Sequence, residues 1–391
     1  MNILSLLHLA KSRGASDLHL VVSSPPILRI TGSLQPVADM PALTAQDIDD
    51  ALSRLTHEKE RADFHHSKEL DFGCTLPDVG RLRCNAARQQ GTTSIAIRLL
   101  PGTIPSIKAL SLPEVCRTLA LKPRGMVIVS GPTGSGKSTT LAAMIKCLND
   151  HESRRIVTIE DPIEYIHPNV KCTVSQREIG TDTLSFADAL KHVLRQDPDV
   201  ILIGEMRDAE TAAAALSIAE TGHLILTTGH APSSYQTIER VIDLFPPHER
   251  HLAQSRLASL LIGVLCQTLI PTSDGSGRVP AVEVMLANPA VRNLIRENKI
   301  YQLPNLIRTH AREGMQLLDQ ALVDLHRQKL ISRNSVFAFC NEHDQVEKLI
   351  ASNGNQVQRL TATDRENGAS DSADRWSPTL TPDHQTGSPL R

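Results

Sequence analysis

The chain has 391 residues, of which 40% are hydrophobic and 3% aromatic, and its formal net charge is −2. This length predicts two domains, or two domains and a tail, with enough apolar residues for packed cores. The small net charge and the few aromatic side chains argue against nucleic-acid binding through phosphate contacts and base stacking.

The seven cysteines are scattered without a C-x-x-C pair, which indicates reduced thiols and argues against a zinc site. The N-terminus has neither a basic leader nor a cleavage site, so we expect an amphipathic helix there. The longest apolar run, which begins at Leu257, is too short and too interrupted to span a bilayer. We therefore expect a cytoplasmic protein that reaches a membrane only through partners.

Residues 1–100 combine helix and strand patterns and are expected to form a small α+β domain. Helical patterns lie at the N-terminus and over residues 44–66. The hairpin-like spacing of the strands predicts an antiparallel sheet with helices on one face. The expected strands are Leu18–Val22, Ile27–Thr31, Leu70–Leu76, Arg81–Ala87 and Thr93–Leu99.

A proline-punctuated stretch, LPGTIPSIKALSLPE, predicts a linker over residues 101–115. Over residues 116–345, strand patterns alternate with helix patterns, as a parallel α/β sheet requires. From residue 246 onward the patterns are mostly helical. Residues 346–391 are polar and are expected to be a disordered tail. The expected strands of the second domain are Met126–Ser130, Arg155–Glu160, Val200–Gly204 and Leu224–Thr228, and its helices include Phe186–Arg195 and Ala209–Glu220.

The stretch GPTGSGKST fits the phosphate-loop pattern G-x-x-x-x-G-K-[ST] and lies between a strand pattern and a helix pattern. Its glycines let backbone N–H groups point at phosphate, Lys137 can reach the terminal phosphates, and Ser138 can bind Mg²⁺. The chain is therefore expected to bind a nucleoside triphosphate together with Mg²⁺. The expected nucleotide-binding residues are Gly131, Pro132, Thr133, Gly134, Ser135, Gly136, Lys137, Ser138 and Thr139.

Acidic or imidazole side chains follow the other three expected parallel strands, at the sheet edge where open α/β sheets bind ligands. The strand-end residues are Glu160, Asp161 and Glu164, then Glu205, Arg207 and Asp208, and finally His230. Glu205 ends a hydrophobic run like a Walker B strand and is a candidate to hold Mg²⁺. Glu160 and Glu164 are candidates to orient or deprotonate the attacking water, and the sequence does not decide between them.

Histidines and arginines complete the set of candidates. His230 is placed to contact the γ-phosphate or its water, whereas His223 is equally compatible with a structural role. A guanidinium at the γ-phosphate accelerates phosphoryl transfer by about 10³–10⁵. Arg195 is one such candidate; Arg83 and Arg98 qualify only if the N-terminal domain covers a nucleotide site.

The ordered motifs GPTGSGKST, TIEDPIEY, VILIGEMRD, AETGH and VIDLFP resemble those of the secretion ATPase superfamily. Within it, the chain resembles the PilT-like retraction motors of type IV pili, from GASDLHL to about residue 335. The segment AVRNLIRE is similar to a motif specific to retraction motors, and the cysteine pair motif of the pilus assembly motors is absent.

This resemblance implies a RecA-like ATPase domain after a PAS-like domain, assembled as a homohexamer with ATP sites between the domains. It assigns Glu160 and Glu164 to an Asp box, Glu205 to Walker B, and His223 and His230 to a His box. It also implies that Arg83 and Arg98 reach the γ-phosphate from the N-terminal domain. The implied partner is the pilus platform protein in the inner membrane, and whether a second retraction ATPase assists stays open. No nucleic-acid partner is expected.

Two departures from the family pattern bear on the hydrolysis rate. The usual T-L-H-T reads Thr228-Gly229-His230-Ala231, and Ala87 replaces an aromatic residue. A glycine before His230 is expected to weaken the strand end and to free the backbone that aims the imidazole. A slow or non-hydrolysing nucleotide-gated ring is therefore an alternative hypothesis, and a nucleic-acid translocase is a third.

Overall fold

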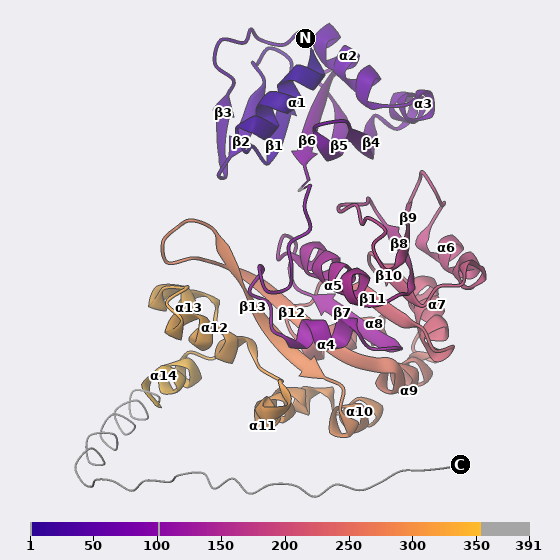
Figure 1. The fold of residues 1–391 in the computed structure, drawn as a ribbon, viewed down its shortest axis with the longest axis vertical. Coiled ribbons are helices and arrows are strands. Elements are labelled where there is room, and N and C mark those ends of the chain that lie inside the picture. Colours follow the sequence, from indigo (N-terminus) through magenta and orange to yellow (C-terminus); the bar gives the residue numbers. More distant parts are fainter. Residues whose placement is uncertain (1, 101, 353–391) are drawn as a thin grey trace, which may run out of the picture. The chain divides into compact units, whose positions relative to one another are not determined.

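The computed structural model describes residues 2–100 and 102–352 (Figure 1). The chain divides into two compact units, of which the first ends at Asn341 and the second begins at Glu342. The second unit contains α14 (His343–Ser352), so the tail prediction was wrong for residues 346–352. Apolar Val346, Leu349 and Ile350 recur there at helical spacing. Residues 353–391 of the predicted tail lie outside the described residues.

The N-terminal part of the first unit contains a six-stranded sheet in the order β3-β2-β1-β6-β5-β4, with every neighbouring pair antiparallel. The predicted antiparallel α+β domain is thus confirmed. Short β3 was not predicted, and Thr56 and His57 divide the helical pattern into two helices. The elements are α1 (Ile3–Ser12), β1 (Asp17–Leu20), β2 (Ile27–Ile30), β3 (Ser33–Pro36), α2 (Ala45–Leu55), α3 (Glu58–Ser67), β4 (Glu69–Leu76), β5 (Gly80–Gln89) and β6 (Thr92–Leu99).

The helices of this domain cover one face of its sheet. Along β5, Leu82, Cys84 and Ala86 are buried in the same core as the apolar sides of α1 and α2. Because side chains alternate along a strand, Arg81 and Arg83 point from the opposite face. This alternation leaves the arginine face of the sheet available to a nucleotide site.

The second sheet has seven strands in the order β13-β12-β7-β11-β10-β8-β9, parallel from β12 to β9. This confirms the α/β, RecA-like class. The elements are α4 (Val115–Ala120), β7 (Gly125–Ser130), α5 (Lys137–His151), β8 (Arg155–Glu160), β9 (Thr173–Glu178), α6 (Phe186–Val193), η1 (Leu194–Gln196), β10 (Val200–Ile203), α7 (Ala209–Glu220), β11 (Leu224–Thr228), α8 (Ser234–Asp243), α9 (Arg250–Leu260), β12 (Leu261–Pro271), β13 (Arg278–Leu286), α10 (Pro289–Arg296), η2 (Ile300–Gln302), α11 (Leu303–Thr309), η3 (Ala311–Glu313), α12 (Leu318–Arg327) and α13 (Arg333–Phe339).

Two hydrophobic cores flank this sheet. Met126 and Ile128 of β7 belong to the core shared with α7 and α9, whereas Val127 and Val129 belong to the core shared with α4 and α5. A strand buried on both faces reads as a continuous apolar run, as β7, β8, β10 and β11 do. The polar edge strand β9 lacks this signal and was not predicted.

The mostly helical interpretation of residues 246–345 was wrong over the β12–β13 hairpin, whose two long strands are orange in Figure 1. β12 pairs in parallel with β7 and antiparallel with β13. Its run LIGVLCQTLI is buried between neighbours, and an apolar run of this kind cannot be distinguished from a buried helix by periodicity alone.

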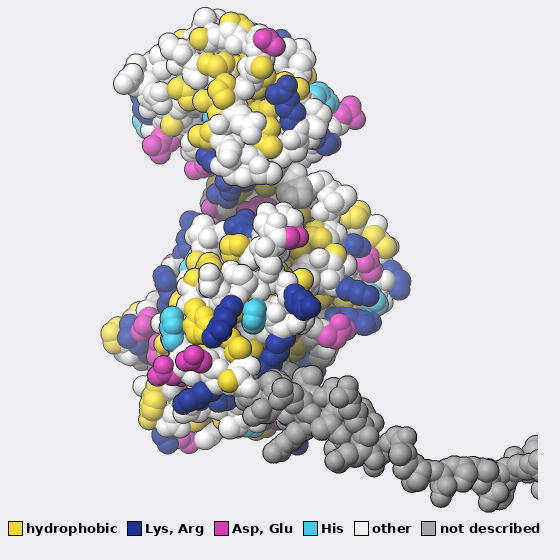
Figure 2. Space-filling view, turned by 90° about the vertical axis from the view of Figure 1, so that its left-hand side faces the viewer, with side chains coloured by type: hydrophobic (Ala, Val, Ile, Leu, Met, Phe, Trp, Pro, Cys, Tyr) yellow, Lys and Arg dark blue, Asp and Glu magenta, His cyan; other side chains and the backbone are white. Residues whose placement is uncertain are grey.

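The surface carries charges of both signs. Figure 2 shows Lys and Arg side chains interspersed with Asp and Glu over the face that it draws. Among the described residues, no helix combines the length and the apolar character needed to cross a membrane.

Candidate functional site

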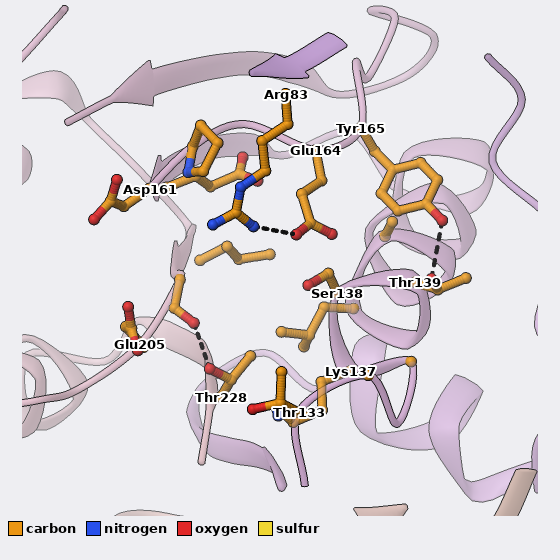
Figure 3. A pocket seen from close by; sticks show the side chains of 18 of the residues that line it. Arg83, Thr133, Lys137, Ser138, Thr139, Asp161, Glu164, Tyr165, Glu205 and Thr228 are labelled. Carbon is orange, nitrogen blue, oxygen red and sulfur yellow. Dashed lines mark hydrogen bonds and ion pairs between the residues drawn. The ribbon is translucent and has the colours of Figure 1, made fainter. Parts of the chain in front are cut away.

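A cavity of about 590 Å³ lies at the carboxyl ends of the parallel strands (Figure 3). Its wall includes the phosphate loop, the residues that follow β8, β10 and β11, and two arginines of the N-terminal sheet. From the predicted site it gathers Arg83, Arg98, Thr133, Gly134, Gly136, Lys137, Ser138, Thr139, Glu160, Glu164, Glu205 and His230.

The phosphate loop joins β7 to α5 in a conformation that its glycines permit. Gly131, Gly134 and Gly136 have φ angles of 138°, 77° and 89°, where a side chain would be strained. Lys137 donates from Nζ to the carbonyls of Gly131 at 2.8 Å and Pro132 at 3.1 Å. Burial lowers the pKa of Lys137 despite the nearby Glu205 and Glu164 carboxylates.

Gln267 of β12 supports this loop and was not among the site residues predicted from the sequence. Its buried amide accepts from Thr140 Oγ1 at 2.7 Å and donates to the Ser135 carbonyl at 2.6 Å. A Cβ at Gly131 would lie 2.3 Å from the Gln267 carbonyl oxygen, so the strand and the loop pack backbone against backbone. A single glutamine inside an apolar run was the available signal.

Glu160 is a partly buried carboxylate at the end of β8. Its Oε1 accepts from Thr158 Oγ1 at 2.6 Å and from Gln176 Nε2 at 3.1 Å. Burial raises its pKa, although these two hydrogen bonds oppose the shift. An oriented carboxylate with a raised pKa is suited to accept a proton.

Glu164 lies on the loop after β8 and has a different environment. It pairs with Arg83 Nη1 at 3.7 Å, and Figure 3 shows both side chains pointing toward the space above Ser138. The next residue, Tyr165, contacts Thr139 Oγ1 through its hydroxyl at 2.9 Å. The loop is thus tied both to the phosphate-binding helix and to the N-terminal sheet.

Glu205, the residue after Gly204 at the end of β10, contacts two cationic or titratable neighbours. Its Oε1 forms an ion pair with Arg207, and its Oε2 lies 3.4 Å from His230 Nε2. The carboxylate is close enough to the phosphate loop to raise the pKa of Lys137, against the larger effect of burial. The predicted Walker B acid and His-box imidazole are therefore direct neighbours.

The backbone before His230 is held in place, contrary to the expectation that Gly229 frees it. The Gly229 N–H donates to the Val129 carbonyl at 2.9 Å. The Ser130 hydroxyl donates to the Ala231 carbonyl at 2.7 Å and accepts from the Ala231 N–H at 3.0 Å. These bonds join the end of β11 to β7, so the missing side chain does not loosen the strand end.

Arg195 and His223 lie away from the cavity. Each precedes its strand, Arg195 in η1 before β10 and His223 just before β11. Parallel strands place such residues at the amino edge of the sheet, opposite the ligand-binding edge. His223 Nδ1 instead contacts the Ile218 carbonyl at 3.1 Å and the Thr221 hydroxyl at 2.9 Å. The proposed role of Arg195 at this chain's own site was therefore wrong.

A largely buried ion pair connects the N-terminal sheet to the loop that carries Glu164. Arg81 of β5 pairs with Glu178 of β9, and its Nε donates to the Ile163 carbonyl at 3.2 Å. Glu178 also accepts from the Ile163 N–H at 2.9 Å. The sequence showed no reason to link these two residues, which lie on different sheets.

The oxygen donors of the site suit Mg²⁺. Within residues 2–100 and 102–352, no group of three or more His, Cys, Asp or Glu side chains could hold a metal. Mg²⁺ commonly takes only one or two protein oxygens and completes its shell with phosphates and water. The Ser138 hydroxyl and the Glu205 carboxylate, both in the cavity wall, fit that requirement.

Chemically, the cavity can cradle a polyphosphate, neutralise its charge and present a carboxylate to a water molecule. Lys137, Arg83 and Arg98 supply positive charge, and the Glu160 carboxylate, whose pKa burial raises, is a candidate for the base. These are the requirements of phosphoryl transfer to water.

The chain is similar to known proteins over most of its length. Residues 12–375 match the family model "Type II/IV secretion system protein". The chain is 44% identical over 335 residues to the "Type IV pilus retractation ATPase PilT" of Pseudomonas aeruginosa, covering 86% of this chain and 97% of that protein. It is 43% identical over 331 residues to the "Twitching motility protein" of Neisseria gonorrhoeae, covering 85% and 88%.

Solved structures show the same fold. A crystal structure of the pilus retraction motor PilT with bound ADP superposes with a TM-score of 0.83 at 41% identity, covering 89% of this chain and 99% of that one. The ATPase DotB of Legionella pneumophila superposes with a TM-score of 0.73 at 28% identity, covering 86% and 94%.

Proposed function

This chain belongs to the type II/IV secretion system protein family, and we propose that it is an ATP-hydrolysing motor that powers retraction of a type IV pilus. One observation carries the proposal. A single cavity joins the phosphate loop to the Glu160, Glu205 and His230 side chains and to two arginines of the N-terminal sheet. A glycine-rich turn that served only to begin a helix would need none of these additional groups.

In the proposed reaction, the loop N–H groups and Lys137 bind the phosphates, and Arg83 and Arg98 neutralise the γ-phosphate. Glu160 orients and deprotonates the attacking water, because its pKa is raised and its carboxylate is held by Thr158. His230, beside Glu205, links the γ-phosphate to the segment before α8. Ser138 and Glu205 would hold Mg²⁺, which supplies charge neutralisation.

We further propose that six copies form a ring at the cytoplasmic face of the inner membrane. Its proposed partner is the pilus platform protein. Arg83 and Arg98 support ring function because they come from a different domain than the phosphate loop. Closure of that domain on ATP would convert hydrolysis into movement.

The direct test is the steady-state ATPase rate of the purified full-length chain, with Lys137→Ala as the blank. We expect turnover clearly above the blank. Turnover equal to the blank would reject the motor and leave the nucleotide-gated ring as the alternative.

The biological test is a deletion strain scored for pilus number and retraction, complemented with the wild type or with Glu205→Ala. We expect the deletion to leave more pili that do not retract, and only the wild type to restore retraction. Unchanged pilus number and dynamics would reject the retraction assignment. DNA-stimulated turnover with steep salt dependence would instead favour a translocase.

A further inference from the structure

Four charged residues form a row across the N-terminal sheet, on the face opposite its helices. The strand register places Asp17 opposite Arg29 on one side and opposite Arg98 on the other. Arg98 is in turn opposite Arg83 on β5. The row therefore contains three arginines and one carboxylate, and its Arg98 and Arg83 line the nucleotide cavity.

Asp17 is the buried member of this row, with 8% of its surface exposed. Its Oδ1 accepts from Arg98 Nε at 2.8 Å, and its Oδ2 accepts from the Ser16 hydroxyl at 2.8 Å. Burial would raise the pKa of this carboxyl, but the bonds from Ser16 and Arg98 and the charge of Arg98 outweigh burial and lower the pKa. Asp17 is consequently ionised at neutral pH.

Asp17 contacts the Nε edge of the Arg98 guanidinium and leaves the opposite edge available for a phosphate. A guanidinium is planar, so fixing Nε sets the direction of the two terminal nitrogens. The Arg98 side chain is 61% exposed and lies in the cavity wall. Arg83 has no such support from Asp17 and pairs with Glu164 of the ATPase domain at 3.7 Å.

We propose that Asp17 is a positioning residue that aims Arg98 at the terminal phosphate of a bound nucleoside triphosphate. The proposal rests on the nucleotide site proposed above, but it does not require hydrolysis. It gives the ASDLHL segment near the N-terminus a function, and it assigns the two arginines different tasks. Arg98 is oriented before nucleotide binds, whereas Arg83 must exchange Glu164 for phosphate.

The test compares nucleotides that differ by the terminal phosphate. The dissociation constants of ADP and of a non-hydrolysable ATP analogue are measured with Mg²⁺ for wild type, Asp17→Ala, Arg98→Ala and the double variant. We expect each single variant to lose about tenfold in preference for the triphosphate, the scale of a hydrogen bond to a charged group. The double variant should lose no more than Arg98→Ala, because Asp17 acts through Arg98.

Arg29→Ala is the matched control, since Arg29 also lies near Asp17, at 3.8 Å, but does not line the cavity. It should keep the wild-type preference. If Asp17→Ala does not fold, Arg98→Lys serves instead, because lysine keeps the charge but lacks the Nε contact, and the same loss is expected.

An unchanged preference in Asp17→Ala, or losses that add in the double variant, would overturn the proposal. So would an unchanged preference in Arg98→Ala. The ATPase assay with Lys137→Ala judges the motor separately: a chain that binds but does not hydrolyse ATP contradicts the motor and leaves the role of Asp17 standing.

Discussion

Glu160 and Glu164, two glutamates four residues apart, have environments that separate their roles. Glu160 is partly buried, and desolvation raises its pKa although the hydrogen bonds from Thr158 and Gln176 oppose the shift. Glu164 is paired with Arg83. The raised pKa suits Glu160 for proton transfer, whereas the ion pair with Arg83 suits Glu164 for sensing the N-terminal domain.

We predict that Glu160→Gln lowers the turnover number about 100-fold or more, the scale of a lost general base. The wild-type rate should fall as pH drops through the raised pKa of Glu160. Glu160→Gln should lower the rate but raise the stability of the fold at high pH. Above that pKa the desolvated charge of Glu160 is unfavourable, so Glu160→Gln should unfold at a higher temperature than the wild type at pH 8.

As pH falls and Glu160 becomes protonated, the difference in unfolding temperature should shrink. Thermal unfolding at several pH values measures it. If Glu160→Gln is less stable than the wild type at every pH, the charge of Glu160 is not unfavourable in the folded chain and the raised pKa is contradicted.

Gly229 is a second residue whose replacement has a definite expected cost. A Cβ there would lie 2.9 Å from Ser130 Oγ, which is fixed by its two bonds to Ala231. We predict that Gly229→Leu, which restores the family's residue, destabilises the fold by about 1–3 kcal/mol through overpacking.

Urea unfolding of Gly229→Leu and of Gly229→Leu/Ser130→Gly measures this effect. The second variant removes the obstructing hydroxyl and should recover part of the loss relative to Ser130→Gly alone. Equal losses with and without the hydroxyl would show that Ser130 is not the obstacle.

At the scale of elements, β12 shapes the phosphate loop although it follows that loop by more than a hundred residues in the chain. Its Gln267 bonds both Thr140 and the Ser135 carbonyl, and its backbone lies against Gly131. The loop conformation is consequently set by the hairpin as well as by its own glycines.

We predict that Gln267→Leu weakens ATP binding and costs about 1–3 kcal/mol of stability, because two buried polar groups lose their partner. Fluorescence titration with a labelled nucleotide and urea unfolding measure the two effects. The double variant Gln267→Leu/Thr140→Val should be less destabilised than the sum of its parts. Strict additivity would argue against a shared network.

The pair of Arg81 on β5 and Glu178 on β9 joins the two sheets. Removing Glu178 leaves the charge of Arg81 largely buried without its partner, so we predict that Glu178→Ala destabilises the chain, by at most about 3–5 kcal/mol. Arg81→Ala/Glu178→Ala should be less destabilised than the sum of the single variants. Thermal unfolding of the three variants measures the coupling, and a coupling near zero would mean that the contact does not stabilise the fold.

At the scale of the whole molecule, the proposed ring requires surfaces that associate. Several large apolar side chains of the ATPase domain are more than half exposed and are candidates for burial between copies. They are Ile166, Val170, Leu184, Leu252 and Tyr301.

We predict that the full-length chain with Mg²⁺ and a non-hydrolysable ATP analogue elutes at about six times its 42.7 kDa mass, because nucleotide closes the domains on one another. Light scattering after size exclusion measures this mass. Leu184→Asp should lower it, while Leu34→Asp, an exposed leucine of the N-terminal sheet, is the control. A monomeric mass at every nucleotide concentration would contradict the ring.

Local patterns in the sequence determined the phosphate loop, the four buried parallel strands and the acidic or imidazole residues that follow three of them. These features depend on short-range spacing and on burial from both faces, which the order of residues records directly. The family resemblance, carried by the same motifs, placed Arg83 and Arg98 at the site.

Only the tertiary structure decided what depends on contacts between distant segments. It converted the run around Gln267 from an expected helix into a strand, because pairing with β7 and β13 outweighs periodicity. It showed that Arg195 lies away from the cavity, because residues that precede a parallel strand lie at the amino edge of the sheet and the cavity lies at the carboxyl edge. It also joined Asp17 to Arg98 across a strand pair, a register that no local pattern in the chain specifies.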